Sequence, residues 1–275
     1  MNNLKMKKSL GQNFLKDEFY ISKIIDSFDL DKNDTVLEIG PGSGALTSRL
    51  SERVKKLYAV EIDQRLTGSL KDNIGQDNFH LFNEDFLKFD LERNVVEDNI
   101  KIVGNLPYHV TSPIIFRVIE LASELNKNKV KIRSLTIMVQ KEVAQRITAA
   151  KNTKAYGILT VLTDFFCEPE ILFDIPPEAF SPKPKITSSM IRLNFSSGSG
   201  NFSKVKDFDH FKKVVKSTFL KRRKMLRNTL KVFDIDLKLI ETVDITCRPE
   251  DLSTAEFIEL SNEICDIKIN SDHNK

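Results

Sequence analysis

Four short segments combine residue types that can bind and orient a small polar ligand. Glu38-Ile-Gly-Pro-Gly-Ser-Gly44 carries three glycines, which let the backbone pass close to a bound molecule. Glu61 and Asp85 are single carboxylates that can accept hydrogen bonds from hydroxyl or amine groups. Asn105-Leu-Pro-Tyr108 joins an amide, a stiff turn and an aromatic ring. Together these segments predict a site for a ligand that carries hydroxyl and amine groups.

The elements that must position these segments are short apolar strands. Strands are expected at residues 35–39, 57–62, 79–82, 100–103 and 134–139, and helices from about Gln64 and over residues 114–125 and 141–150. This alternation predicts an α/β fold with a mostly parallel, Rossmann-like sheet that helices cover on both faces. Because such sheets bind ligands at the carboxyl ends of their strands, all four segments should meet at one edge.

The glycine-rich loop favours S-adenosylmethionine over a dinucleotide as the cofactor. A G-x-G-x-x-G pattern would place a diphosphate at the following helix, whereas this loop has G-x-G-x-G spacing after an acidic residue. Gly40 and Gly42 are therefore expected to line the cofactor, and Glu61 to bind its ribose hydroxyls. The alternative for the loop alone is a tight connection without a ligand.

A nucleoside clamp is expected one strand further along. Asp85 would accept a hydrogen bond from the adenine amine of the cofactor, with Ile62 and Phe86 on either side of the ring. Taken singly, a residue such as Glu61 or Asp85 is more often a solvated loop carboxylate or a helix cap. Their order along successive strand ends favours the binding role.

Asn105-Leu-Pro-Tyr108 suits methyl transfer to an aromatic amine. The lone pair of such an amine is delocalised into the ring, so the site must orient the nitrogen with acceptors for both N–H groups. The Asn105 side chain and the backbone carbonyl of Leu106 or Pro107 are the candidates, at the roughly 3 to 3.5 Å approach of a reactive geometry. Tyr108 would stack on an extruded adenine, and Phe180 would close its other side. For the tetrapeptide alone, the alternative is a proline turn with a buried tyrosine.

The remaining composition narrows the class of protein. Hydrophobic residues make up 40% of the 275 residues and charged residues 29%, which is typical of a globular chain. Cys167, Cys247 and Cys265 form no CxxC pair, so neither a disulfide framework nor a metal site is expected. No export signal and no apolar stretch of the roughly 18 residues needed to span a membrane is recognisable. We therefore expect a cytoplasmic protein without a metal. His109, beside the tetrapeptide, is expected to be structural.

The last quarter of the chain differs in character from the rest. Ser196-Ser-Gly-Ser-Gly-Asn201 resembles a linker, and apolar residues at helical spacing follow it. We expect a cofactor-binding catalytic domain over residues 1–196 and a small all-helical RNA-binding domain over residues 197–275. An amphipathic helix there would present a cationic face to RNA phosphates with Lys221, Arg222, Arg223, Lys224 and Arg227. The alternative is a charge run that only solvates a helix.

The chain resembles the small-subunit rRNA adenine dimethyltransferases nearly end to end. The matching stretches are Ser9-Leu-Gly-Gln-Asn-Phe-Leu15, Val36 to Thr47, Val60-Glu-Ile-Asp63, Gly104 to Pro113, Gln140-Lys-Glu-Val-Ala-Gln-Arg146 and Phe180-Ser-Pro-Lys-Pro-Lys185. The resemblance implies a class I methyltransferase sheet and a monomer that acts in small-subunit biogenesis. It also implies S-adenosylmethionine binding by Asn13, Leu15, Gly40, Glu61, Asp85 and Asn105. The implied reaction dimethylates two adjacent adenosines in the 3′-terminal hairpin loop of 16S rRNA within the small ribosomal subunit.

Two other functions are compatible with these motifs. Macrolide-resistance methyltransferases share the same tetrapeptide chemistry but act on 23S rRNA, and the match over residues 104–113 with the helical tail favours the small subunit. The second alternative is a non-catalytic RNA-binding assembly factor that has kept the methyltransferase fold. The intact Glu61, Asp85 and Asn105-Leu-Pro-Tyr108 argue against that alternative.

Overall fold

The computed structural model of the chain describes residues 14–125, 130–195 and 201–273. By their contacts these residues form two compact units. The first consists of residues up to 144 together with residues 170–195, and the second of residues 145–169 and the part of the chain beyond residue 195. Each unit has its own core and is described by itself.

The first unit is built on a mixed sheet. Its strands are β2 (Thr35–Ile39), β3 (Lys56–Val60), β4 (Phe79–Phe82), β5 (Asn99–Asn105), β6 (Lys131–Gln140), β7 (Glu168–Ile175) and β9 (Ser188–Asn194). They lie in the order β4-β3-β2-β5-β6-β9-β7. The first five strands pair in parallel, and β9 pairs antiparallel with β6. The expected α/β, Rossmann-like architecture is confirmed, although the sequence pattern does not predict β7 and β9.

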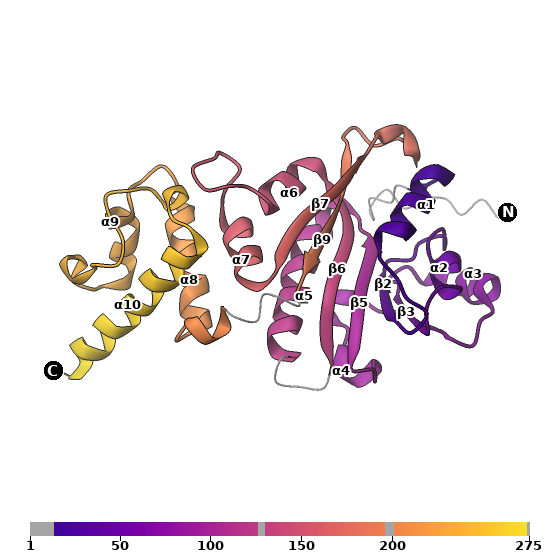
Figure 1. Ribbon diagram of the computed structural model, residues 1–275, viewed down its shortest axis with the longest axis horizontal. Coiled ribbons are helices and arrows are strands. Elements are labelled where there is room, and N and C mark those ends of the chain that lie inside the picture. Colours follow the sequence, from indigo (N-terminus) through magenta and orange to yellow (C-terminus); the bar gives the residue numbers. More distant parts are fainter. Residues whose placement is uncertain (1–13, 126–129, 196–200, 274–275) are drawn as a thin grey trace. The chain divides into compact units, whose positions relative to one another are not determined.

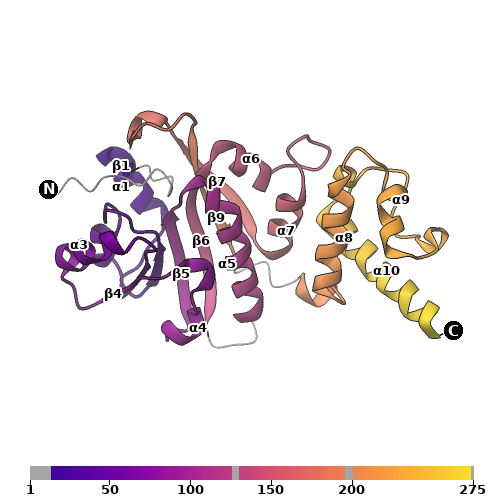
Figure 2. The same ribbon diagram turned by 180° about the vertical axis from the view of Figure 1, so that it is seen from behind.

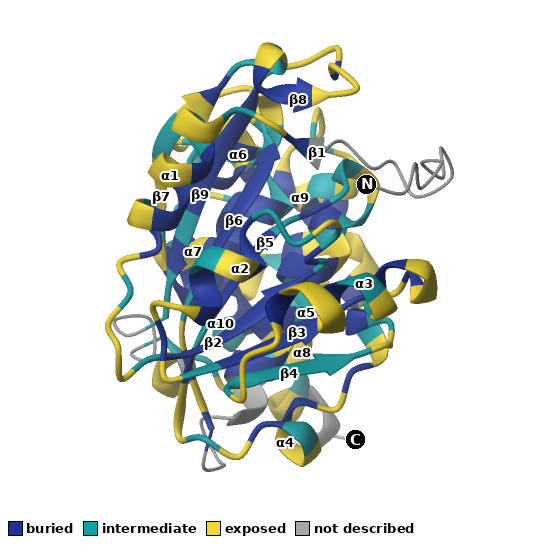
Figure 3. Cartoon of the chain, turned by 90° about the vertical axis from the view of Figure 1, so that its right-hand side faces the viewer, coloured by how far each residue is buried: buried dark blue, intermediate teal, exposed yellow. Residues whose placement is uncertain are grey.

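The strand order reverses between β2 and β5. From β2 the chain moves outward through β3 to β4, and it then returns to the other side of β2 as β5. All five residues of β2 are buried, as expected for the centre of a parallel sheet, whereas β4 at the sheet edge is only half-buried (Figure 3). The carboxyl ends of the strands beside such a reversal are where open α/β sheets bind ligands.

Helices lie on both faces of this sheet (Figures 1 and 2). The α-helices of this unit are α1 (Glu18–Ser27), α2 (Thr47–Ser51), α3 (Gln64–Ile74), α4 (Leu91–Asn94) and α5 (Thr111–Leu125), and α6 (Lys141–Ile147) runs on from it into the second unit. Asp17 caps α1 by accepting from the backbone N–H of Phe19 and Tyr20, and Ile21, Ile24 and Ile25 are buried at helical spacing. The α1 residues pack into a core cluster with residues of α2, β2 and β3.

The second unit is helical over the residues described. Its helices are α7 (Ile158–Phe166), α8 (Phe208–Leu220), α9 (Leu226–Thr229) and α10 (Thr254–His273). Phe165 of α7 packs against Phe208 and Phe211 of α8, with ring centroids 5.5 and 4.7 Å apart. The division expected at residue 196 assigns α7 to the catalytic domain, whereas these contacts group α7 with α8 and α10.

The expectation that the cationic residues lie on one amphipathic helix is wrong. Helix α8 ends at Leu220, and residues 221–224 form a turn before the short α9. The backbone leaves the helical region at Lys221, with φ −122° and ψ 49°, and the Lys224 N–H donates back to the Lys221 carbonyl at 2.7 Å. Four of the five predicted RNA-contacting residues therefore lie on a turn rather than on a helix face.

Candidate active site

A cavity of about 210 Å³ lies at the carboxyl ends of β2 to β5 in the first unit. Its walls come from the loop or turn after each of these strands, and from Leu15 and Phe180 outside the main sheet. All the predicted cofactor and catalytic residues that the structure describes line it: Leu15, Gly40, Gly42, Glu61, Ile62, Asp85, Phe86, Asn105, Leu106, Pro107, Tyr108 and Phe180. Asn13 lies outside the described residues.

The glycine loop after β2 brings main chain to the wall of this cavity. Gly40 and Gly42 have φ of 66° and 60°, in the left-handed region where a side chain would be strained. Gly104, near the end of β5, lets this strand lie close to β2, because a Cβ there would lie only 2.8 Å from the Ile39 carbonyl oxygen. The ends of β2 and β5 can therefore stand side by side beneath the cavity.

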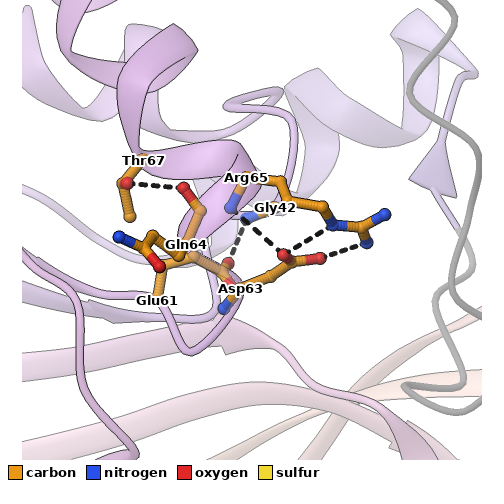
Figure 4. Close-up of polar contacts among 6 residues, drawn as sticks. All are labelled: Gly42, Glu61, Asp63, Gln64, Arg65 and Thr67. Atoms are coloured by element: carbon orange, nitrogen blue, oxygen red, sulfur yellow. Dashed lines mark hydrogen bonds and ion pairs between the residues drawn. The ribbon is translucent and has the colours of Figure 1, made fainter.

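Glu61 is a buried carboxylate, 4% exposed, that reaches from the end of β3 to the glycine loop. Its Oε2 accepts from the Gly42 N–H at 3.0 Å and its Oε1 from the Asp63 N–H at 2.8 Å (Figure 4). Burial raises the pKa of Glu61 above its ordinary value, although both backbone N–H donors oppose this shift. Each carboxylate oxygen can accept a second hydrogen bond, so Glu61 can still bind hydroxyl groups.

The turn after β4 supplies another part of the cavity wall. Asp85 is half-buried and accepts from the Leu87 N–H at 3.0 Å, which caps the short 3₁₀ helix η2 (Phe86–Lys88). Phe86 is buried and packs into the wall, whereas Ile62 is 57% exposed although it lines the cavity. An apolar side chain exposed inside a cavity is suited to contact the face of a flat ring.

Asn105 ends β5, and the chain then turns into the 3₁₀ helix η3 (Tyr108–Val110). The Pro107 carbonyl accepts from the Val110 N–H at 3.1 Å, within this turn. Because the Pro107 carbonyl already accepts this bond, the Leu106 carbonyl is the better candidate of the two predicted backbone acceptors for an amine ligand. The Tyr108 hydroxyl lies 2.7 Å from the Ser188 hydroxyl at the start of β9.

Leu15 and Phe180 reach the cavity through a second, two-stranded sheet. β1 (Phe14–Leu15) pairs antiparallel with β8 (Phe180–Ser181), with Leu15 opposite Phe180. The Lys16 N–H also donates to the Ala179 carbonyl at 2.9 Å. Both side chains are buried, so two segments far apart in the sequence, at Leu15 and Phe180, form one side of the cavity.

Two residues that the sequence reasoning left without a role belong to the site. Glu38 lines the cavity, is 2% exposed, and its Oε2 has no hydrogen-bond partner among the described residues. Burial raises the pKa of Glu38 to about 8; the Thr47 hydroxyl opposes this shift, and the nearby Glu61 carboxylate contributes to it. The position of Glu38 just before the glycine-rich loop could have indicated its place at the site. No sequence pattern indicates Ser188, because it reaches the site only through the pairing of β9 with β6.

The predicted RNA-contacting residues lie in the second unit. Lys221, Arg223, Lys224 and Arg227 are exposed. Arg222 is half-buried, and its guanidinium donates to the carbonyls of Lys154 and Thr153 at 2.6 and 2.8 Å. Arg222 therefore fastens the 151–154 loop to the turn, a structural role that the sequence does not predict.

The chain is similar in sequence to proteins of one known family. The family model described as ribosomal RNA adenine dimethylase matches residues 3–266. A "Ribosomal RNA small subunit methyltransferase A" of Clostridium botulinum is 44% identical, covering 96% of this chain and 95% of its own. A protein of the same name from Alkaliphilus oremlandii is 39% identical, covering 94% and 92%.

Solved structures share the fold. A dimethyladenosine transferase from Plasmodium falciparum has a TM-score of 0.73 at 23% identity and covers 90% of this chain and 95% of its own. The 23S rRNA methyltransferase ErmE has a TM-score of 0.68 at 24% identity, with 92% and 100% covered. Over the described ranges no group of three or more metal-ligating side chains occurs, and no helix there is long and apolar enough to cross a membrane.

Proposed function

Because this chain belongs to the ribosomal RNA adenine dimethylase family, we propose that it methylates the exocyclic amines of two adjacent adenosines in the 3′-terminal hairpin loop of 16S rRNA. Membership of this class I methyltransferase family implies the use of S-adenosylmethionine. The observation that carries the proposal is the single cavity that joins Glu61, Asp85 and Asn105-Leu-Pro-Tyr108. We further propose that the protein acts as a cytoplasmic monomer in small-subunit biogenesis.

The polar groups of the cavity fit this cofactor. Glu61 keeps acceptor capacity for two ribose hydroxyls, and Asp85 can accept from the adenine amine while Ile62 and Phe86 enclose the ring. Leu15 and Gly40 complete the wall, and Asn13 is carried over from the family motif. The buried Glu38 Oε2, which has no hydrogen-bond partner within the described part of the chain, suits the ammonium group of the methionine part, because a buried carboxylate is stabilised by an opposite charge. When bound, S-adenosylmethionine supplies an electrophilic methyl group on a positive sulfonium.

The residues after β5 orient the target amine. The Asn105 side-chain carbonyl and the Leu106 backbone carbonyl accept from the two N–H groups, which turns the nitrogen lone pair toward the methyl group. Fixed acceptors at this point cost no reorganisation during the reaction. The product's extra proton can pass to water, so none of the cavity residues has to act as a general base.

Tyr108 and Phe180 hold the extruded base between them. Both line the cavity, from η3 and β8 respectively. One contact between a base and an aromatic ring contributes about 1 to 3 kcal/mol, which offsets part of the cost of unstacking the adenosine.

The curated relatives favour the small subunit over the large one. The relatives at 39 to 44% identity are named for the small subunit, whereas the ErmE likeness at 24% identity concerns the fold alone. The exposed Lys221, Arg223, Lys224 and Arg227 would add RNA phosphate contacts, which carry little sequence information but position the substrate.

Methyl transfer to purified subunits tests the proposed substrate. The protein is incubated with methyl-labelled S-adenosylmethionine and, separately, with unmethylated small and large ribosomal subunits. Label confined to 16S rRNA, and lost in an Asn105→Ala variant, supports the proposal. Label in 23S rRNA would assign the macrolide-resistance reaction instead. Binding of cofactor and RNA without transfer to either subunit would indicate an assembly factor.

A further inference from the structure

The Tyr108 ring is anchored at both of its ends. Its backbone begins η3 at the carboxyl end of β5, and its hydroxyl lies 2.7 Å from the Ser188 hydroxyl. Tyr108 is half-buried at the cavity wall, whereas Ser188 is completely buried. The contact therefore joins a residue that faces the ligand to one inside the protein frame.

The antiparallel strand brings Ser188 to this edge of the sheet. In the register of β6 and β9, Ser188 pairs with Gln140, the last residue of β6. An antiparallel strand thus contributes its first residue at the edge where the parallel strands contribute their last.

The backbone under Ser188 is held from the other face of the strand. The adjacent Ser189 donates to Asp174 Oδ1 at 2.6 Å, and the Lys141 ammonium lies 2.5 Å from Asp174 Oδ2. These contacts hold the pKa of Asp174 below its ordinary value, and the Lys141 hydrogen bond is the largest cause. Successive side chains of a strand point to opposite faces, so this network fixes β9 without entering the cavity.

We propose that Ser188 is a positioning residue for methyl transfer, which fixes the direction of the Tyr108 ring axis through their shared hydrogen bond. This inference rests on the proposed function, in which Tyr108 stacks on the target adenine. A tilted ring would tilt the base and move its amine out of reactive alignment, and displacements of about 1 Å can cost about a hundredfold in rate. The same bond occupies the Tyr108 hydroxyl, so that hydroxyl orients the ring and takes no part in proton transfer.

Three variants isolate this hydrogen bond. Ser188→Ala and Tyr108→Phe each remove it and keep the ring, and the combined variant removes both partners. The matched control is Ser189→Ala, which removes a bond of similar length from the neighbouring buried residue on the opposite face. Single-turnover methylation of unmethylated small subunits is measured for each, together with the affinity for S-adenosylhomocysteine, the melting temperature and the ratio of monomethyl to dimethyl product.

Ser188→Ala and Tyr108→Phe are each expected to slow transfer about tenfold to a hundredfold and to accumulate monomethyladenosine. The combined variant should be no slower than the slower of the two single variants, because each single variant already removes the same hydrogen bond. Cofactor affinity should stay within about twofold of the unaltered protein, and Ser189→Ala should keep its rate and product ratio.

Either of two results would overturn the role of Ser188. Ser188→Ala could transfer at the rate of Ser189→Ala, or the losses in the two single variants could multiply in the combined one. Failure of the proposed function itself looks different, because the unaltered protein would then form no dimethyladenosine on the small subunit.

Discussion

The carboxylate of Glu61 accepts a hydrogen bond from the backbone N–H of Gly42 at 3.0 Å, and so ties the end of β3 to the glycine loop after β2. Its second oxygen holds the Asp63 N–H at 2.8 Å, just before α3. One side chain thereby sets the spacing of two loops that face the cavity. Acceptor sites that remain on both oxygens can bind a ligand without disturbing this arrangement.

Glu61→Gln should weaken binding of S-adenosylhomocysteine about tenfold to a hundredfold. Glutamine keeps one acceptor oxygen but turns an NH₂ donor toward a backbone N–H, so one charge-assisted bond to a ribose hydroxyl, worth about 1.5 to 3 kcal/mol, is lost. Titration calorimetry measures the change. Asp90→Asn removes a carboxylate that caps α4 away from the cavity and should stay within twofold. Equal affinity in Glu61→Gln and the unaltered protein would remove Glu61 from the ribose site.

Glu38 should make the stability of the ligand-free protein fall with rising pH. Its pKa is about 8 in the folded protein against an ordinary value of 4.5, so the folded state binds more protons than the unfolded state between these pH values. The stability that protonated Glu38 contributes is complete below about pH 4.5 and is lost as the pH rises through about 8. The full difference amounts to at most about 5 kcal/mol.

Urea unfolding from pH 5 to 9 measures this effect. Glu38→Gln should be less sensitive to pH than the unaltered protein and relatively more stable at pH 8 to 9. Binding of the cofactor's ammonium would favour the charged carboxylate, so binding at pH 7 should release a proton in the unaltered protein and less in Glu38→Gln. Parallel pH profiles for the two proteins would contradict the burial of a protonated Glu38.

Arg223→Ala and Lys224→Ala should each weaken binding to 16S rRNA and lower the slope of log affinity against log salt by about 1. Both side chains are exposed on the 221–224 turn, where they can neutralise phosphates. Filter binding over a range of salt concentrations provides the slope. Lys32→Glu, in the exposed loop before β2, is the control and should leave the slope unchanged. An unchanged slope in both alanine variants would argue that these charges only solvate the turn.

Arg222→Ala should loosen the 151–154 loop. Its guanidinium supplies hydrogen bonds to two carbonyls of this loop, at Thr153 and Lys154, and alanine leaves both carbonyls to water. Hydrogen exchange of residues 151–157 should accelerate, and trypsin should cut faster after Lys151 and Lys154. Arg223→Ala is the matched control, since its side chain is exposed. Unchanged exchange in Arg222→Ala would show that the loop holds its conformation without this residue.

The parts of the fold that depend on local pattern could be predicted from the sequence. The strand at Thr35–Ile39 has the predicted bounds, because a short run rich in apolar residues ends at a glycine-rich loop. The positions of Glu61 and Asp85 followed from the rule that strand ends meet at one edge of a parallel sheet. The placement of their side chains in one cavity agrees with that reasoning, while their ligand roles stay predictions.

The parts that depend on distant contacts could not be predicted. Apolar spacing continues from Phe219 to Leu226 as if one helix ran through, whereas Arg222 is drawn to carbonyls 68 and 69 positions away. Ser188 reaches Tyr108 only because β9 pairs antiparallel with β6. The raised pKa of Glu38 likewise follows from the depth of its burial, which its sequence motif does not reveal.

The identity of the modified nucleosides tests the proposed methyl transfer to 16S rRNA. Unmethylated small subunits are methylated to completion by the purified protein, and the 16S rRNA is digested and sequenced by mass. We expect N6,N6-dimethyladenosine at two adjacent positions in the 3′-terminal hairpin loop, and none when Asn105 is replaced by alanine. Methylation of another nucleoside, or of another helix of the rRNA, would contradict the proposed function. Undiminished methylation by the Asn105→Ala variant would contradict it as well.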